Sequence, residues 1–193
     1  MEPELLSLLD EIHRWGQDHD AEECDKSRKM LNLRPDTAHF VSILVRSTRR
    51  KQLLEIGTSN GYSTIWLAWS LSGSGGRLVS VDHSAEKHAM AHENLRRAGL
   101  RDIVDLRLGD ATIIASELQN QFDFVLFDSV QVQPHRQLEV LLDKLTDNAI
   151  VLADNVLSHP EEMSPFLSII EALPDFDHVV VPVGKGLCMA YKG

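Results

Sequence analysis

The chain contains little cysteine and no long apolar run. Its 193 residues include two cysteines, Cys24 and Cys188, which cannot form a disulfide framework and stand in no CxxC or Cys/His cluster. We therefore expect a reducing compartment. No apolar segment approaches the ~18 residues of a membrane span, and residues 1–4 lack the basic and apolar regions of a signal peptide. We expect a soluble cytoplasmic protein with no membrane partner.

Positive charge is also scarce. There are 19 Lys and Arg residues against 29 Asp and Glu residues, so the formal net charge is −10. Such a field repels a phosphate backbone, and a nucleic acid is not expected as a partner. The remaining composition is ordinary, with 43% hydrophobic and 25% charged residues, which excludes disorder and collagen-like repeats. The length suits one domain.

Two helices are expected near the N-terminus. The first has one apolar face, because apolar residues recur there at helical spacing: Leu5, Leu8, Leu9, Ile12 and Trp15. A polar stretch follows over residues 17–29. The second helix is expected to begin at Pro35, a residue favoured in the first helical turn, and to run to about Arg46.

From Lys51 onward, short apolar runs alternate with helix-compatible segments. The five runs cover residues 53–56, 78–81, 103–106, 122–127 and 149–153. Because each run is apolar on both faces, the pattern predicts parallel strands buried on both sides and joined by right-handed crossovers. Two further runs, 178–183 and 187–191, are separated by three residues and predict a closing hairpin. The sequence therefore predicts an α/β fold with an antiparallel strand at the C-terminal edge of the sheet.

A glycine-rich turn follows the first strand. Gly57 and Gly61 permit a sharp turn and a close approach of the backbone to a ligand, at the strand ends where open α/β sheets bind ligands. The GxxxG spacing is a poor match to the GxGxxG of dinucleotide-binding proteins. Residues 57–61 also match the nucleophile elbow GxSxG, with Asp154 and His178 as later partners. The segment before the turn reads as helical, whereas a hydrolase needs strands there, so a cofactor site is favoured.

Acidic residues end three successive strands. Glu55 ends the first, Asp82 ends the second, and Asp110 follows the third. Asp82 lies 21 positions after Gly61, a distance that suits hydrogen bonds to ribose hydroxyls. Three carboxylates at one sheet edge would repel a pyrophosphate and would favour a cation that carries a nucleoside. The sulfonium of S-adenosylmethionine is such a cation.

A second polar set ends the fourth and fifth strands. Asp128 follows one strand, and Asp154 and Asn155 follow the next, so adjacent strands would bring the three together. Two carboxylates and an amide oxygen suit Mg²⁺, or alternatively Ca²⁺ or Mn²⁺, rather than zinc. Such a metal would lower the pKa of a bound hydroxyl group. The alternative is that Asp154 and Asn155 only cap the turn before Pro160.

These segments resemble class I S-adenosylmethionine-dependent methyltransferases, and more narrowly the catechol and caffeoyl-CoA O-methyltransferase group with its bacterial relatives. The likeness runs from about Met30 to Lys192 and rests on residues 55–63, 81–82, 109–111, 124–128, 152–157 and 184–187. It implies a Rossmann-like, seven-stranded, mostly parallel sheet with helices on both faces. Residues 1–48 would form N-terminal helices and a lid, and residues 49–193 the core of a single domain.

The resemblance also implies how a cofactor would be held. Glu55 and Gly57 would line its methionine part, Ser63 would bind its carboxylate beside a helix N-terminus, and Asp82 would accept the ribose hydroxyls. Asp110 and Ala111 would hold the adenine, and Leu33 would lie in the lid. The full set expected to bind S-adenosylmethionine is Leu33, Glu55, Gly57, Ser63, Asp82, Asp110, Ala111 and Asp128. In the family, the positions of Asp128, Asp154 and Asn155 hold Mg²⁺.

The implied activity is metal-assisted O-methylation of a small hydroxylated acceptor, and we expect this acceptor to be aromatic. One departure concerns the proton acceptor, because Gln131 stands where the family usually has a basic residue. His135 and His159 are candidate substitutes, and the catalytic base stays open. Lys185 lies between two glycines, and we interpret it as a turn lysine rather than as a site residue.

Two alternatives to this activity therefore remain open. Gln131 and the apolar residues beside it, Val130 and Val132, are compatible with a cofactor-binding regulatory protein or a catalytically impaired homologue. The other alternative is methylation of a hydroxylated uridine in tRNA, which the net charge disfavours. The apolar first helix suggests a homodimer.

Overall fold

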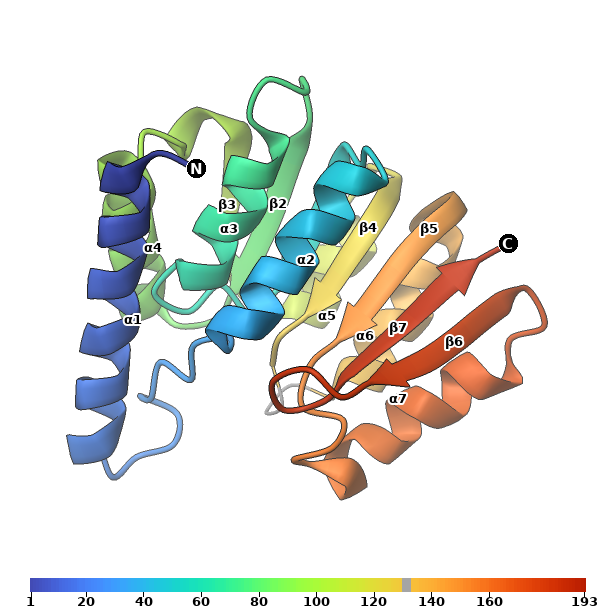
Figure 1. The fold of residues 1–193 in the computed structure, drawn as a ribbon. Coiled ribbons are helices and arrows are strands. Elements are labelled where there is room, and N and C mark those ends of the chain that lie inside the picture. Colours follow the sequence, from blue (N-terminus) through green and yellow to red (C-terminus); the bar gives the residue numbers. More distant parts are fainter. Residues whose placement is uncertain (130–132) are drawn as a thin grey trace.

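The computed structural model describes residues 1–129 and 133–193. Its strands form one seven-stranded sheet in the order β3-β2-β1-β4-β5-β7-β6, with helices on both faces (Figure 1). The strands are β1 (Gln52–Ile56), β2 (Arg77–Asp82), β3 (Val104–Leu108), β4 (Phe122–Phe127), β5 (Leu145–Ala153), β6 (Phe176–Val181) and β7 (Leu187–Lys192). The α-helices are α1 (Pro3–Glu22), α2 (Pro35–Ser47), α3 (Tyr62–Leu71), α4 (Ala85–Arg97), α5 (Ala111–Glu117), α6 (Pro134–Leu141) and α7 (Pro160–Ala172).

The pairing of the strands confirms the predicted mostly parallel sheet. β1 pairs in parallel with both β2 and β4, β2 pairs with β3, and β4 pairs with β5. β7 runs antiparallel to both of its neighbours, β5 and β6. The C-terminal hairpin is therefore confirmed, and β6 holds the outermost position. The order of strands reverses between β1 and β4, which is the point where open α/β sheets bind ligands.

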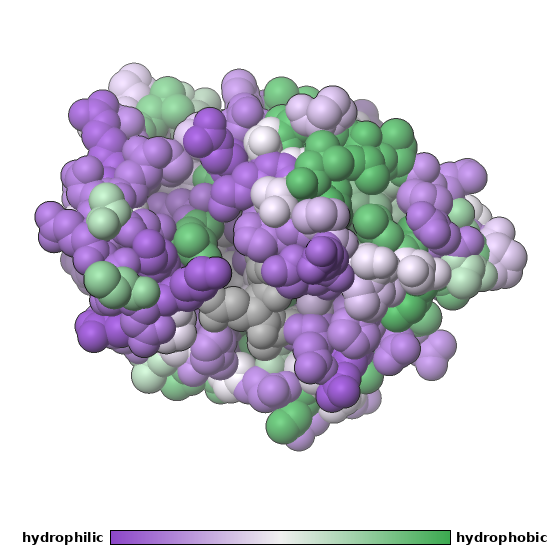
Figure 2. Space-filling model, turned by 90° about the horizontal axis from the view of Figure 1, so that it is seen from below, coloured by the Kyte–Doolittle hydropathy of each residue, from purple (hydrophilic) through white to green (hydrophobic). Residues whose placement is uncertain are grey.

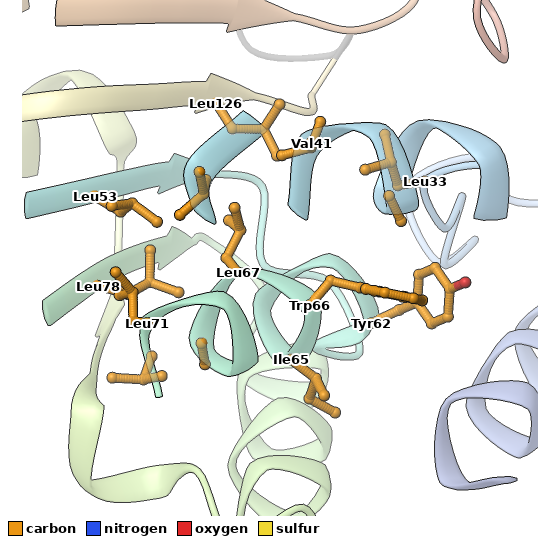
Figure 3. Close-up of a cluster of buried hydrophobic side chains, with 14 of the residues drawn as sticks. Leu33, Val41, Leu53, Tyr62, Ile65, Trp66, Leu67, Leu71, Leu78 and Leu126 are labelled. Atoms are coloured by element: carbon orange, nitrogen blue, oxygen red, sulfur yellow. The ribbon is translucent and has the colours of Figure 1, made fainter. Parts of the chain in front are cut away.

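The core consists of two apolar layers, one on each face of the sheet. Neighbouring residues of β1 point to opposite layers, with Leu53 in one and Leu54 in the other. The first layer is covered by α1 to α4, and Figure 3 shows Leu67 and Leu71 of α3 facing Leu53 and other strand side chains. The second layer is covered by α5, α6 and α7. Burial on both faces explains why the strands are almost continuously apolar.

The first helix differs from its prediction. α1 continues through part of the polar stretch that was expected to follow the first helix, and it ends at Glu22. Trp15 was expected on the buried face, and this is wrong: it is 44% exposed and stacks on His19. Gly16 takes the buried position one turn after Ile12, because a Cβ there would lie 2.6 Å from Nδ2 of Asn32. Gly16 therefore lets α1 pack closely against the segment that contains Asn32, and the indole of Trp15 lies outside this contact.

No helix in the described parts of the chain combines the length and apolar character that crossing a membrane requires.

Candidate functional site

A cleft of about 750 Å³ opens at the carboxyl ends of the parallel strands. Its walls come from the residues that follow β1 to β5, from the segment between α1 and α2 (residues 23–34, here called the strap) and from the turn between β6 and β7. Figure 2 views this edge from below and shows mainly hydrophilic side chains around it, with hydrophobic ones gathered at the upper right. The volume is typical of sites for small molecules and cofactors.

Two glycines shape the turn between β1 and α3. Gly57 has a φ of 107°, and a Cβ at this position would lie 2.4 Å from the backbone oxygen of Asp128. Gly61 has a φ of 88° and faces the backbone of Ala91 in α4, where a Cβ would lie 3.1 Å from Cα. Both positions combine a positive φ with a close backbone contact, so a residue with a side chain would be strained at either of them.

Asp82, at the end of β2, is held by backbone donors on both oxygens. The amide of Ser59 donates to Oδ2 and the amide of Ser84 donates to Oδ1, each at 2.8 Å. The side chain lines the cleft although the residue is only 8% exposed. The carboxylate therefore has a fixed direction at the β2 end of the cleft, and its remaining lone pairs are available to hydroxyl donors.

Asp110 immediately precedes α5 and also lines the cleft. Its Oδ1 accepts hydrogen bonds from the amides of Thr112 at 2.8 Å and Ile113 at 3.0 Å, which makes it a helix N-cap. Its Oδ2 has no protein partner among the described residues. Ala111 follows it on the cleft wall.

Glu55 lies beneath the cleft rather than in its wall. It is fully buried, and its Oε2 accepts hydrogen bonds from Thr64 and Ser80, each at 2.6 Å. Its Oε1 has no hydrogen-bond partner among the described residues. Burial raises the pKa of Glu55 to about 7, while the neighbouring hydroxyl groups of Ser63, Ser80 and Thr64 act against that rise. Glu55 therefore does not line the cleft as expected, whereas Ser63 does.

Asp128 and Asp154 extend two adjacent strands. Phe127 of β4 pairs with Ala153 of β5, and the amide of Asp154 donates to the carbonyl of Phe127 at 3.0 Å. The two residues are therefore neighbours on adjacent strands; Asp128 lines the cleft and Asp154 does not. Burial, the charge of Asp154 and the charge of Glu55 hold the pKa of Asp128 well above its usual range. Burial also raises the pKa of Asp154 to about 6, against a hydrogen bond from the Asn155 amide.

Asn155 follows Asp154 and is the third residue of the predicted metal-binding set. It is buried with a φ of 73°, a conformation that Asn tolerates, and it lines the cleft. Oδ1 of Asp154 is buried and has no hydrogen-bond partner among the described residues. In the same parts of the chain, no three His, Cys, Asp or Glu side chains gather closely enough to hold a metal. A metal set here would therefore depend on the amide oxygen of Asn155.

The cleft brings together most of the predicted site. Seven of the eight expected cofactor-binding residues line it, all except Glu55: Leu33, Gly57, Ser63, Asp82, Asp110, Ala111 and Asp128. Among the described residues, His159 lines the cleft and His135 does not. Gln131, Val130 and Val132 lie outside the described residues. Ser59 donates its hydroxyl hydrogen to the carbonyl of Met30 at 2.7 Å, which gives no support to a nucleophile elbow.

Sequence reasoning missed how the strap is held over the cleft. Asp20 of α1 accepts hydrogen bonds from the amides of Met30 and Leu31, at 2.6 and 2.8 Å. Nζ of Lys87, in α4, donates to the carbonyl of Lys29 at 2.6 Å. These contacts join residues far apart in the chain and have no local sequence signal.

Lys185 does lie in the turn between β6 and β7, as expected, and it also lines the cleft. A lysine between two glycines carries no local signal that separates a site residue from a turn residue. The difference comes from the segments that pack around the turn.

Comparisons with known proteins agree with this geometry. Residues 17–192 match the model of the family described as O-methyltransferase. A catechol O-methyltransferase from Niastella koreensis is 30% identical over 131 residues, which cover 66% of this chain and 59% of that protein. Caffeoyl-CoA O-methyltransferase 1 from Eucalyptus globulus is 23% identical over 217 residues, which cover 99% of this chain and 82% of that protein. The matched region thus spans about three fifths of the bacterial relative.

A solved structure extends the likeness to three dimensions. The O-methyltransferase from Bacillus cereus in complex with SAH has a TM-score of 0.83 and 27% identity, and the match covers 97% of this chain and 91% of that one. The strand order, the glycine turn after β1 and the acids at the strand tips thus occur in a chain whose near-full length fits one family model. This chain belongs to the O-methyltransferase family.

Proposed function

We propose that this protein is an S-adenosylmethionine-dependent O-methyltransferase that transfers a methyl group to a hydroxyl of a small aromatic acceptor. The observation that carries the proposal is the single cleft in which the glycine turn, Asp82 and Asp110 meet Asp128 and Asn155. The glycine turn, Asp82 and Asp110 suit a cationic nucleoside. Asp128 and Asn155 suit a hydroxylated acceptor. Family membership and the SAH complex of the Bacillus cereus relative support the same cofactor.

The residues at the tips of β1, β2 and β3 fit the cofactor. Asp82, held rigid by two backbone donors, would accept the ribose hydroxyls, and Asp110 with Ala111 would border the adenine. Ser63, in the first turn of α3, would bind the carboxylate of the methionine part. When bound, S-adenosylmethionine supplies an electrophilic methyl group. Leu33 and the strap would exclude water from the site.

The residues at the tips of β4 and β5 fit a divalent cation, with Mg²⁺ as our proposal. Asp128 and Asp154 are neighbours on adjacent strands with raised pKa values, and Asp154 has a buried oxygen without a hydrogen-bond partner among the described residues. A hard cation would satisfy that oxygen and offset both charges. When bound, the metal would lower the pKa of an acceptor hydroxyl. Only Asp128, Asp154 and Asn155 would hold it, which leaves positions open for acceptor oxygens.

The position of the two candidate histidines decides which one can accept the proton of the acceptor hydroxyl. Of the two candidate histidines, His159 is in the cleft wall. Its Nδ1 lies 2.9 Å from the hydroxyl of Ser158, so Nε2 is the nitrogen available to a hydroxyl proton. We propose His159 for this role in place of His135.

The test measures methyl transfer to catechol with S-adenosylmethionine, in the presence of Mg²⁺ and of a chelator. We expect a singly methylated product and the demethylated cofactor in equal amounts, with the rate falling at least tenfold when the metal is removed. Calorimetry with the cofactor alone is the parallel measurement. Absence of heat with S-adenosylmethionine and with its demethylated product would overturn the proposal, and turnover unaffected by the chelator would remove the metal from it.

We also propose a homodimer and a cytoplasmic location. α1 exposes Leu6 and Trp15, which are 47% and 44% accessible in the single chain. Light scattering after size exclusion should give twice the mass of 21.7 kDa. Trp15→Glu should shift that mass to the monomer value, and an unchanged dimer would show that another surface forms the contact.

A further inference from the structure

Lys185 lies at the tip of the turn between β6 and β7, and its backbone is tied to the segment after β5. Its carbonyl accepts hydrogen bonds from the amides of Leu157 at 3.2 Å and Ser158 at 3.1 Å. The carbonyl of Gly186 accepts a third from Val156 at 3.1 Å. The turn is therefore attached to the same segment that carries Asn155.

Neither Gly184 nor Gly186 has room for a side chain, so Lys185 is the side chain that the turn presents. Gly184 has a φ of 58°, and a Cβ there would lie 2.1 Å from Oγ1 of Thr37 in α2. A Cβ on Gly186 would lie 2.4 Å from Cγ of Leu157. The turn is packed between α2 and the post-β5 segment, which aims the half-buried Lys185 into the cleft.

The ammonium of Lys185 has neither a hydrogen bond nor an ion pair with any described residue. The hydrogen bonds between its turn and residues 156–158 place Lys185 at the end of the cleft that also contains Asp128 and Asn155. By contrast, Nζ of Lys29 donates to the carbonyl of Asp20, and Nζ of Lys87 donates to the carbonyl of Lys29. These two amines of the cleft wall are already engaged with backbone.

We propose that Lys185 binds a carboxylate on the acceptor, so that hydroxylated aromatic acids are preferred over their neutral analogues. This inference rests on the proposed function and specifies its substrate class. A half-buried lysine that has no partner among the described residues and lies beside the proposed acceptor position forms a charge-assisted hydrogen bond with an anion at little reorganisation cost. The cation proposed for Asp128 and Asp154 would offset their charge, which otherwise repels an acidic acceptor. Glu162, also in the wall, is exposed and leaves the ammonium unpaired.

The test compares two acceptors of almost equal shape, 3,4-dihydroxybenzoate and 3,4-dihydroxybenzamide. The ratio of their kcat/KM values is measured for the wild type, Lys185→Gln, Lys185→Arg and Lys51→Gln. Comparing ratios between variants cancels the different electronic effects of the two substituents. Lys51→Gln is the matched control, because this substitution also removes one positive charge. Lys51 precedes β1 and therefore lies at the opposite edge of the sheet.

We expect Lys185→Gln to lower the acid-to-amide ratio about tenfold, which corresponds to about 1.4 kcal/mol. Lys185→Arg should retain most of the preference, and Lys51→Gln should retain all of it. Calorimetry of the benzoate with protein saturated with demethylated cofactor and Mg²⁺ should show the same weakening of Kd in Lys185→Gln.

The outcomes separate the inference from the function on which it rests. If both compounds are methylated and the ratio is the same in Lys185→Gln as in the wild type, the inference is wrong and the function stands. An equal fall of the ratio in Lys51→Gln would also overturn it, because the effect would then be one of net charge. If neither compound is methylated and the cofactor gives no heat, the proposed function itself fails.

Discussion

Replacing Glu55 with Gln should make the protein less sensitive to alkaline pH. Glu55 is fully buried at the end of β1, where burial raises its pKa to about 7 from an ordinary value of 4.5. Gln keeps an acceptor oxygen for Thr64 and Ser80 but cannot ionise. The amide NH₂ would take the place of Oε1, which has no partner in the described structure.

The direction follows from proton binding in the two states. Between pH 4.5 and 7 the folded protein keeps the proton on Glu55 while the unfolded chain has lost it, so raising the pH favours unfolding. The two pKa values correspond to about 3.4 kcal/mol in total, of which about 2.5 kcal/mol falls between pH 5 and pH 8. The loss levels off above pH 7. A bound sulfonium cation would favour the ionised form and reduce this loss.

The assay is urea unfolding of the wild type and Glu55→Gln at pH 5, 6, 7 and 8, without cofactor. Subtracting the two curves removes most of the contribution of other groups that titrate in this range. Relative to Glu55→Gln, the wild type should lose about 2.5 kcal/mol between pH 5 and pH 8. Glu117→Gln, an exposed position at the end of α5, should show no such trend. A difference between wild type and Glu55→Gln that does not change with pH would refute the reasoning.

Three further substitutions test other parts of the site. Gly57→Ala should lower the free energy of unfolding in urea by at least about 2–3 kcal/mol, because the new Cβ would lie 2.4 Å from the carbonyl oxygen of Asp128 and φ is unfavourable. The control Gly73→Ala, with a positive φ but nothing within 4 Å, should lower it by only about 1 kcal/mol. Equal losses in the two variants would contradict this reasoning. Asp82→Asn should weaken binding of the demethylated cofactor about tenfold by calorimetry, since it removes a charge from the β2 tip; unchanged affinity would place the ribose elsewhere. Asp154→Asn should stabilise the metal-free protein at pH 8 by about 3 kcal/mol, because a buried acid with a pKa of about 6 is then no longer ionised. The same substitution should abolish the gain in Tm with Mg²⁺, and a variant less stable than the wild type at pH 8 would count against the reasoning.

The fold could be predicted where local pattern and tertiary burial agree. Strands buried on both faces read as apolar runs, so β1, β2 and β4 were found within a residue or two. β5 begins at Leu145, four residues before its predicted start, because its first half includes exposed polar residues that give no apolar signal. Trp15 was misplaced because helical spacing alone does not distinguish a buried tryptophan from a glycine contact at the next position.

The acids of the site could be predicted because the carboxyl ends of parallel strands meet at one edge. That rule locates backbone positions, and Asp82, Asp110, Asp128 and Asn155 do lie in one cleft. The rule does not give the direction of a side chain, and Glu55 turned inward. Lys185 is the opposite case, because contacts from α2 and the post-β5 segment direct it into the cleft and neither contact is local in sequence.

The unsatisfied carboxyl oxygens connect stability with ligand binding. Oε1 of Glu55 and Oδ1 of Asp154 are buried without hydrogen-bond partners among the described residues, and both residues lie at the ends of strands near the cleft. An arrangement that served stability alone would replace such groups with apolar side chains, since buried charges without partners cost several kcal/mol. Cationic ligands offset that cost only in the folded state, so the sulfonium and the divalent cation should each raise Tm in proportion to the logarithm of their concentration.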